Sequence, residues 1–98
     1  MWRPTASHWR SDMAKTVEIY TSPLCGFCHR AKRLLDARGI PYVEYDVLMD
    51  RDRKQEMLAR AEGRHTVPQI FIDGEGIGGS DELVEMDREG RLDDLRAA

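Results

Sequence analysis

The chain has 98 residues, of which 41% are hydrophobic and 34% are charged, and its formal net charge is −3. This size and balance predict one globular domain with a modest core that needs no disulfide staples. The acidic balance argues against nucleic acid as a partner, and no apolar run is long enough to cross a membrane.

Residues 1–14 show no consistent hydrophobic period. They lack the apolar core of a secretory signal and the sustained amphipathic, acid-poor helix of an organelle-targeting peptide. We expect a flexible, dispensable extension ahead of a domain that covers residues 15–98. A partner-binding arm built on Trp2 and Trp9 is the alternative.

Residues 16–21 alternate with period two and are rich in β-branched and aromatic side chains, which predicts a strand. A Ser-Pro-Leu turn follows, and apolar side chains then recur at helical spacing from Cys25 until Gly39, which suits a helix C-terminus. Cys25 and Cys28 are therefore about one turn apart at a helix start. Unpaired amides and the helix dipole favour a thiolate on Cys25, and the thiolate is the reactive form.

A second strand is predicted over residues 42–47, and Asp50 is suited to cap a helix that runs to about residue 62. The first strand–helix–strand unit must be parallel and right-handed, which puts the Cys25 end of the helix at the carboxyl edge of the sheet. Turn residues then predict a strand over 69–72 and, after Asp73-Gly74, a hairpin partner at 76–77. A helix capped by Ser80 or Asp81 follows and ends near residue 88. The last predicted element is a short helix that carries Leu92 and Leu95. The order βαβαββαα predicts an α/β fold in which helices flank a small mixed sheet.

Several kinds of site share a Cys-x-x-Cys-His string. A redox dithiol lies at a helix start just after a strand, which is the context predicted here. A c-type haem would use His29 as an axial ligand, and a structural zinc site would have to recruit His8, His29 and His65 beside the one cysteine pair. An iron–sulfur site needs ligands from outside the chain, and two inert buried cysteines are the remaining alternative. We favour the redox dithiol, and with it a reducing compartment, by default the cytoplasm.

Three blocks in order carry a resemblance: the strand followed by Cys-x-x-Cys, Thr-Val-Pro-Gln-Ile-Phe-Ile from Thr66, and Gly-Gly-Ser-Asp from Gly78. Together they resemble the glutaredoxins over residues 15 to about 95. The resemblance implies a thioredoxin fold with a four-stranded mixed sheet. It also implies a glutathione-dependent thiol–disulfide oxidoreductase that reduces protein–glutathione mixed disulfides and protein disulfides.

The resemblance assigns a role to each matching position. Cys25 matches the nucleophile and Cys28 the resolving thiol. Pro68 matches a proline that is cis in the family and faces the active cysteine, and Val67 matches the residue whose backbone pairs with the cysteinyl backbone of glutathione. The full set of expected glutathione contacts is Phe27, Gln55, Thr66, Val67, Pro68, Gly79, Ser80 and Asp81.

At one end of that set, Ser80 and Asp81 match a helix N-terminus that holds the γ-glutamyl group, with amides for its carboxylate and the aspartate for its ammonium. At the other end, Ser22 stands where many members carry a lysine that binds the glycine carboxylate, a role open to Gln55 or an arginine. The ordinary alternatives are a plain helix cap for Ser80-Asp81 and a solvated helix face for Gln55.

The interior of the motif, Gly26-Phe27, is similar to the monothiol, iron–sulfur-carrying class, although Cys28 replaces the serine of that class. The second hypothesis is therefore a dimer that binds a [2Fe–2S] cluster through Cys25 of each subunit and two glutathiones. Otherwise we expect a monomer. A redoxin reduced by a flavoprotein is the third hypothesis, and Ser80-Asp81 argues against it.

Overall fold

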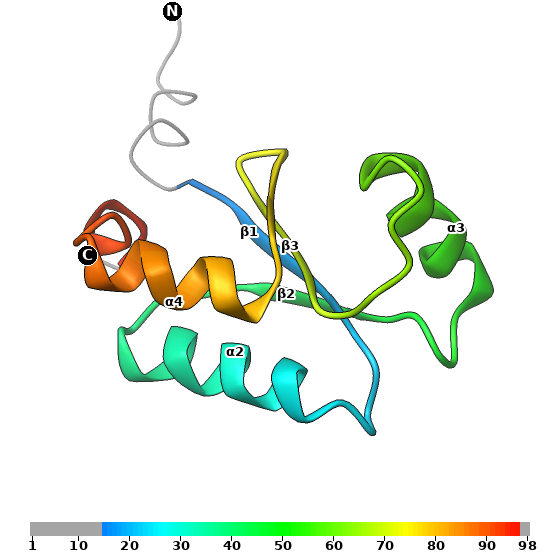
Figure 1. Ribbon diagram of the computed structural model, residues 1–98, viewed down its shortest axis with the longest axis horizontal. Helices are drawn as coiled ribbons and strands as arrows, with labels where there is room; N and C mark the ends of the chain where they lie inside the picture. The colour runs from blue at the N-terminus through cyan, green and yellow to red at the C-terminus, as the bar shows by residue number, and fades with distance from the viewer. Residues whose placement is uncertain (1–14, 97–98) are drawn as a thin grey trace, which may run out of the picture.

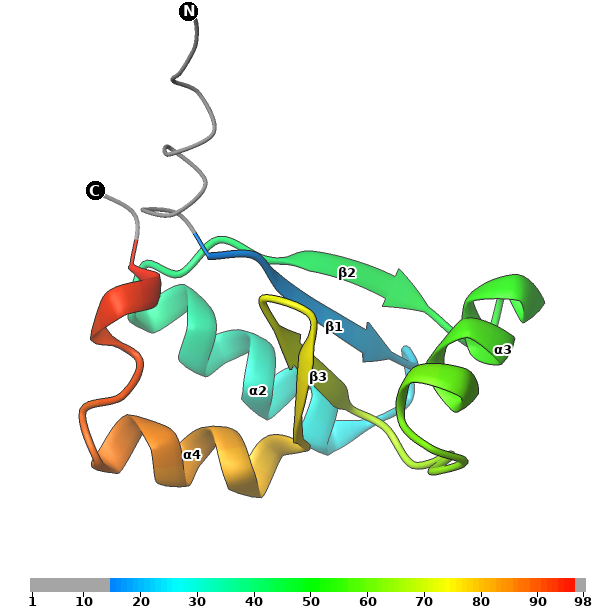
Figure 2. The same ribbon diagram turned by 90° about the horizontal axis from the view of Figure 1, so that it is seen from above.

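The computed structural model describes residues 15–96 as a four-stranded sheet flanked by helices (Figures 1 and 2). Residues 1–14, on which the predicted extension falls, and residues 97–98 lie outside the described residues. In chain order the elements are β1 (Val17–Thr21), α2 (Gly26–Ala37), β2 (Val43–Asp46), α3 (Arg51–Arg60), β3 (Gln69–Ile72), β4 (Glu75–Gly78), α4 (Ser80–Arg88) and η1 (Asp93–Leu95). The predicted α/β order is confirmed, although the last helix is a single 3₁₀ turn.

The strands are arranged in the order β2–β1–β3–β4. β1 is parallel to β2, with Thr21 opposite Asp46, while β3 is antiparallel to both β1 and β4. The Val47 N–H donates to the Thr21 carbonyl at 2.9 Å, so the pairing of β1 and β2 continues one residue past β2. The start of α2 therefore lies at the carboxyl edge of β1, as predicted.

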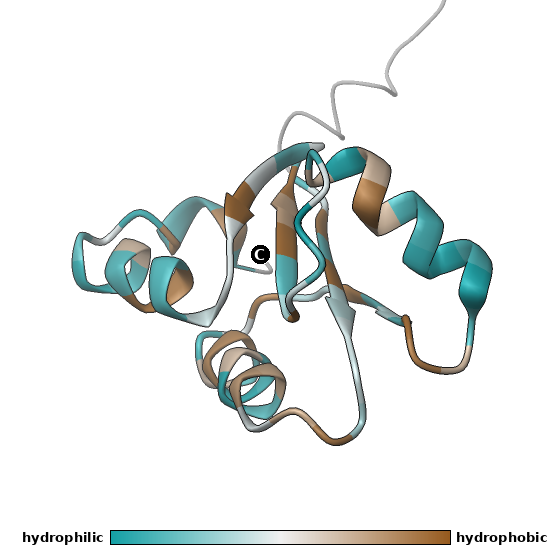
Figure 3. Ribbon diagram, turned by 45° about the vertical axis from the view of Figure 1, so that its right-hand side comes forward, coloured by the Kyte–Doolittle hydropathy of each residue, from teal (hydrophilic) through white to brown (hydrophobic). Residues whose placement is uncertain are grey.

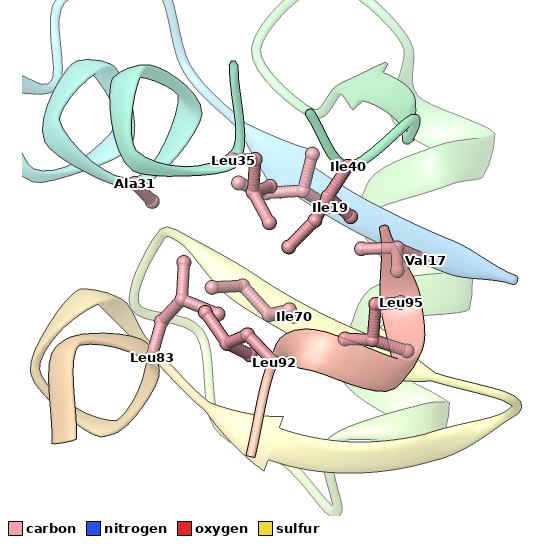
Figure 4. Packing of buried hydrophobic residues seen from close by; sticks show 9 residues of the cluster. All are labelled: Val17, Ile19, Ala31, Leu35, Ile40, Ile70, Leu83, Leu92 and Leu95. Atoms are coloured by element: carbon pink, nitrogen blue, oxygen red, sulfur yellow. The ribbon is translucent and has the colours of Figure 1, made fainter. Parts of the chain in front are cut away.

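Helices α2 and α4 cover one face of the sheet and α3 covers the other (Figure 2). Alternate residues of β1 point to opposite faces, so Ile19 packs beneath α2 and α4 while Tyr20 packs beneath α3. Apolar residues gather on the inner sides of these layers, as the colouring in Figure 3 shows. The larger cluster, drawn in Figure 4, consists of Val17, Ile19, Ala31, Leu35, Ile40, Ile70, Leu83, Leu92 and Leu95.

The face beneath α3 combines a small apolar cluster with a polar network. The Tyr20 ring lies against the rings of Tyr45 and Phe71, with centroids 4.9 and 5.6 Å away. The Arg60 guanidinium lies 4.2 Å from the Phe71 ring centroid and donates to the Glu18 carboxylate and the Tyr20 hydroxyl. These contacts attach α3 to the sheet, and the chain leaving α3 leads directly to the segment before β3.

Helix caps agree with the prediction at α3 and differ from it at α4. The Asp50 carboxylate accepts the N–H groups two and three residues further on, at 3.0 and 3.2 Å. The prediction that Ser80 or Asp81 caps α4 is wrong, because Gly79 occupies the cap position. The Glu82 carboxylate accepts the Gly79 N–H at 2.7 Å, which fixes the helix start one residue earlier. In residues 15–96, no helix is both long enough and apolar enough to span a bilayer.

Candidate active site

Cys25 is the N-cap residue of α2, in an extended backbone conformation. Its sulfur accepts the Cys28 N–H at 3.2 Å, which is one of the amides left unpaired by the first helical turn. Its thiol also donates to the Val67 carbonyl at 3.5 Å. The sulfur is thus held between a helix start and the segment that precedes β3, and it remains partly exposed.

Cys28 lies one turn further along α2, and its side chain is fully buried. Burial raises the pKa of the Cys28 thiol to about 12, and the neighbouring Cys25 side chain adds to the rise. Both cysteines are free thiols. A large disulfide substrate can therefore reach the Cys25 sulfur, while Cys28 stays protonated and available for attack from inside.

The segment facing Cys25 is Thr66-Val67-Pro68, and its Val67–Pro68 peptide bond is cis, as the family resemblance implies. The buried Gln69 side chain donates to the Thr66 carbonyl at 3.0 Å and to the Thr66 hydroxyl at 3.1 Å. These two bonds fix the backbone just before the cis peptide. The Val67 carbonyl consequently points at the Cys25 sulfur.

A groove of about 300 Å³ lies beside Cys25, between Phe27 of α2, the segment before β3 and the start of α4. Among the expected glutathione contacts, it is lined by Phe27, Thr66, Val67, Pro68, Gly79, Ser80 and Asp81. Gln55 is exposed on α3 and does not line this groove. Residues that the sequence did not single out also line it, namely Arg64, Gln69, Gly78 and Glu82.

The start of α4 closes one end of the groove. A Cβ atom at Gly79 would lie 3.1 Å from the Pro68 carbonyl oxygen, so a glycine allows the helix to approach the cis peptide closely. Ser80 lines the groove, and its buried hydroxyl has no hydrogen-bond partner among the described residues. The Gly79 N–H is already bound by Glu82, so the Ser80 hydroxyl and the amides after it are the groups available to an anion.

Two arginines bring positive charge to the groove. The Arg30 guanidinium forms an ion pair with Asp81 at 2.8 Å and lies 5.8 Å from the centroid of the Phe27 ring. Arg64 lines the groove at its other side, ahead of Thr66. Because Asp81 already has a cationic partner, a ligand that binds here meets an anion and a cation side by side.

The histidine in the motif has a local role. The His29 Nε2 lies 3.2 Å from the Pro23 carbonyl oxygen, in the turn that leads into α2. Within residues 15–96, no group of three or more His, Cys, Asp or Glu side chains is arranged to hold a metal ion.

A dithiol at a helix start, facing a cis-proline segment on a four-stranded mixed sheet, defines the thioredoxin-fold thiol–disulfide oxidoreductases. The glutaredoxin family profile matches residues 17–77. A relative in Synechocystis sp., described as a probable glutaredoxin, is 50% identical over 97 residues, which cover 98% of this chain and 89% of the relative. Glutaredoxin 3 of Escherichia coli K12 is 48% identical over 79 residues, or 81% of this chain and 94% of that protein.

Among solved structures, a buckwheat glutaredoxin–glutathione complex is similar to this chain with a TM-score of 0.72 and 33% identity, covering 83% of this chain and 76% of that one. The chain belongs to the glutaredoxin family, and thiol–disulfide oxidoreduction is its general activity.

Proposed function

We propose that this protein is a glutathione-dependent oxidoreductase that reduces protein–glutathione mixed disulfides and protein disulfides. The observation that carries the proposal is the groove itself: one part of its wall is Val67, whose carbonyl accepts from the Cys25 thiol, and another is the helix start at Ser80, which carries a buried, unpartnered hydroxyl. A tripeptide with a thiol near its middle and an anionic group at each end matches this arrangement. The related buckwheat protein, solved as a glutathione complex, supports the same ligand.

In the proposed complex, the Val67 backbone pairs with the cysteinyl residue of glutathione, which brings the glutathione sulfur to Cys25. The Ser80 hydroxyl and the following amides donate to the γ-glutamyl carboxylate, while the Asp81 carboxylate accepts from the ammonium. Arg30 orients Asp81 from the other side. Proline at position 68 and glycine at position 79 complete the walls, together with Phe27 and Thr66.

The glycine carboxylate of glutathione needs a cation, and Ser22 cannot supply one. We assign this role to Arg64, because Arg64 lines the groove whereas Gln55 does not, and among the described residues only its Nε is engaged, by the Ala61 carbonyl at 3.4 Å. A guanidinium also matches a carboxylate geometrically, since it can donate two parallel hydrogen bonds. This assignment replaces the lysine of other family members, at position 22, with an arginine from the segment that follows α3.

The first reaction uses Cys25 and glutathione. The Cys25 thiolate attacks the glutathione sulfur of a protein–glutathione disulfide, so that a Cys25–glutathione disulfide forms and the protein leaves as a thiolate that takes up a proton. A second glutathione, as its thiolate, then attacks the glutathione sulfur bound to Cys25. This step releases oxidised glutathione and regenerates the Cys25 thiolate.

The second reaction also uses Cys28. After the Cys25 thiolate attacks a protein disulfide, the Cys28 sulfur attacks the Cys25 sulfur and breaks the Cys25–substrate bond. The substrate thiolates released in the two steps take up protons, one of them the proton that Cys28 loses, and a Cys25–Cys28 disulfide remains. Two glutathiones reduce that disulfide and leave as oxidised glutathione. Burial holds Cys28 in the thiol form until the mixed disulfide forms beside it. Because the cycle requires a reduced glutathione pool, we assign the protein to the cytoplasm.

A [2Fe–2S] cluster shared between two subunits is the second candidate. The accessibility of the two thiols favours this form over a cluster within one chain, because Cys25 is partly exposed while Cys28 is fully buried. One thiolate from each subunit would hold the cluster, and two glutathione thiolates would complete its ligands. Such a protein would be a dimer when loaded and a monomer otherwise.

The deciding experiment is a glutathione-coupled assay on the mixed disulfide of glutathione and 2-mercaptoethanol, run beside an absorbance spectrum of anaerobically purified protein. Turnover that requires glutathione, in a colourless protein, supports the oxidoreductase. A brown protein with visible absorbance and little turnover supports the cluster-bound dimer. Turnover with a flavoprotein reductase and none with glutathione would reject both.

A further inference from the structure

Large apolar side chains are exposed around the Cys25 end of the sheet. In the part of the chain that the structure describes, the most exposed large hydrophobic residues are Leu24 at 90%, Met49 at 77%, Phe27 at 60%, Leu48 at 57% and Val43 at 52%. Single exposed apolar residues are ordinary, but several beside a reactive group mark an interaction site. All of these except Val43 lie in or next to the two loops at the carboxyl ends of β1 and β2.

These two loops leave the same edge of the sheet. Thr21 of β1 is opposite Asp46 of β2, and the Val47 N–H donates to the Thr21 carbonyl at 2.9 Å. Leu24 follows three residues after Thr21, and Leu48 follows immediately after Val47. In Figure 3 the hydrophobic colour appears in both loops, at the same end of the strands, although one loop leads to α2 on one face of the sheet and the other to α3 on the opposite face.

The loop after β2 has a defined conformation that holds its apolar residues outside. The Asp46 carboxylate accepts the Leu48 N–H at 2.8 Å and the Met49 N–H at 3.0 Å, and Asp50 then caps α3. The carboxylates of Asp46 and Asp50, on either side of Leu48 and Met49, thus accept the backbone N–H groups of this loop and of the start of α3. Neither Leu48 nor Met49 is needed for the core, and a loop fixed in this way presents them to a partner.

We propose that Leu48 and Met49, together with Leu24, form a docking surface for a polypeptide segment whose disulfide is flanked by apolar side chains. The proposal rests on the proposed reduction of protein disulfides at Cys25, which lies at the same edge of the sheet as these loops. The glutathione groove is built from the segments around β3 and α4, on one side of β1, whereas the docking surface lies toward β2, on the other side. The surface therefore stays free while glutathione is bound.

The make-up of the surface fits a transient partner. The flexible, polarisable methionine side chain adapts to different apolar neighbours, which suits an enzyme with more than one substrate. The charged start of α3, beginning at Asp50, borders the apolar centre on one side. An apolar patch of a few side chains is far smaller than a stable interface, so the reduced substrate can leave after each turnover.

The test compares three substrates in a double variant, Leu48→Ser with Met49→Ser. The substrates are a peptide whose single intramolecular disulfide is flanked by leucines, the same peptide with serines, and the glutathione–mercaptoethanol disulfide. We expect kcat/KM for the leucine peptide to fall about tenfold, which corresponds to about 1.4 kcal/mol. The other two substrates should change by less than about twofold, because neither carries apolar side chains that the docking surface could contact. Val43→Ser is the matched control, because Val43 is also apolar and is 52% exposed, but it lies at the far end of β2. It should leave the rates with all three substrates unchanged.

Equal losses on all three substrates would show that the loop affects the reactivity of Cys25, and the docking surface would be rejected. An unchanged rate on the leucine peptide would reject it as well. If the wild-type protein shows no glutathione-dependent turnover, the proposed function fails. The docking surface is then still tested by single-turnover reaction of the dithiothreitol-reduced protein with the two peptides, in which a lost preference for leucine again supports it and an unaltered preference rejects it.

Discussion

Replacing Arg60 with alanine tests how α3 is attached to the sheet. The Arg60 guanidinium donates to the two Glu18 carboxylate oxygens at 2.9 and 3.2 Å and to the Tyr20 hydroxyl at 2.8 Å. It also lies 4.2 Å from the Phe71 ring centroid. Its removal leaves a carboxylate without its cation next to the apolar cluster beneath α3.

The expected loss follows from the contacts and from their exposure. A hydrogen bond to a charged group contributes about 1.5–3 kcal/mol, and a guanidinium over a ring adds about 0.5–2 kcal/mol. The Arg60 and Glu18 side chains are 26% and 22% exposed, which places the pair between an exposed one, at about 0–1 kcal/mol, and the breaking of a buried one, at about 3–5 kcal/mol. We expect Arg60→Ala to lower the free energy of unfolding by about 2–3 kcal/mol, and the Tm by about 10–20 °C.

Urea unfolding followed by far-UV circular dichroism measures this loss. Arg88→Ala is the matched control, because Arg88 is also a helix arginine that pairs with a glutamate. Its partner is Glu85 at 3.7 Å, and the two side chains are 74% and 60% exposed. The control should lose less than about 0.5 kcal/mol. If Arg60→Ala costs no more than Arg88→Ala, at an unchanged m-value, the attachment of α3 through Arg60 is refuted.

The pH dependence gives a second readout of the same pair. The hydrogen bonds from Arg60 lower the pKa of Glu18 below its ordinary range. A carboxylate with a lowered folded-state pKa stabilises the fold above its unfolded pKa of about 4.3, and this contribution is lost as the pH falls through the folded value. The difference in stability between wild type and Arg60→Ala should therefore be full at pH 7 and should shrink below pH ~4.

Three further predictions concern the site. Cys28→Ser should leave reduction of glutathione mixed disulfides largely intact and impair reduction of protein disulfides, whereas Cys25→Ser should abolish both; equal losses in the coupled assay would contradict these roles. Asp81→Ala should raise the KM for glutathione about three- to tenfold, since this side chain is largely exposed, and an unchanged KM would make it a plain helix residue. Gly78→Ala should lower stability by about 1–2 kcal/mol in thermal unfolding, because φ is +108° at Gly78, whereas Gly26→Ala, with open space around its Cβ, should not destabilise.

Local signals predicted the first half of the fold well. The alternation of residues 16–21 and the helical spacing after Cys25 each act over one element, and the side chain of Asp50 caps α3 through amides two and three residues away. Secondary structure set by such short-range bonds is legible in the sequence. The position of Cys25 at a helix start followed from the same signals, and α2 confirms it.

The start of α4 shows where local reasoning fails. Ser80 and Asp81 are both good caps by side-chain chemistry, yet Gly79 is the cap residue. The spacing from Gly79 to Glu82 is that of a capping box and could have indicated this start. The close approach of Gly79 to Pro68 could not, because it joins segments that meet only in the folded sheet.

The choice between Gln55 and Arg64 is a second case in which reasoning from sequence position failed to find the residue that lines the groove. A match by position selected Gln55 on α3, but the side chain that lines the groove is Arg64. The helical phase of α3 and the path of the chain after it decide which of the two residues lines the groove. The sequence shows Arg64 close to the Thr-Val-Pro block, whereas only the fold shows that Arg64 lines the groove.

The pair formed by Arg30 and Asp81 changes how the γ-glutamyl end would be recognised. The two residues are 51 positions apart, and only the packing of α2 against α4 brings them to 2.8 Å. In the proposed complex, the ammonium of the ligand competes with Arg30 for the Asp81 carboxylate, while the ligand carboxylate attracts the Arg30 guanidinium. A ligand that carries both charges on one carbon satisfies the two side chains together, and a ligand with one of them leaves the other side chain unpaired. In the proposed complex, selectivity for a free α-amino acid end arises from these two adjacent opposite charges, even though each is too exposed to bind strongly by itself.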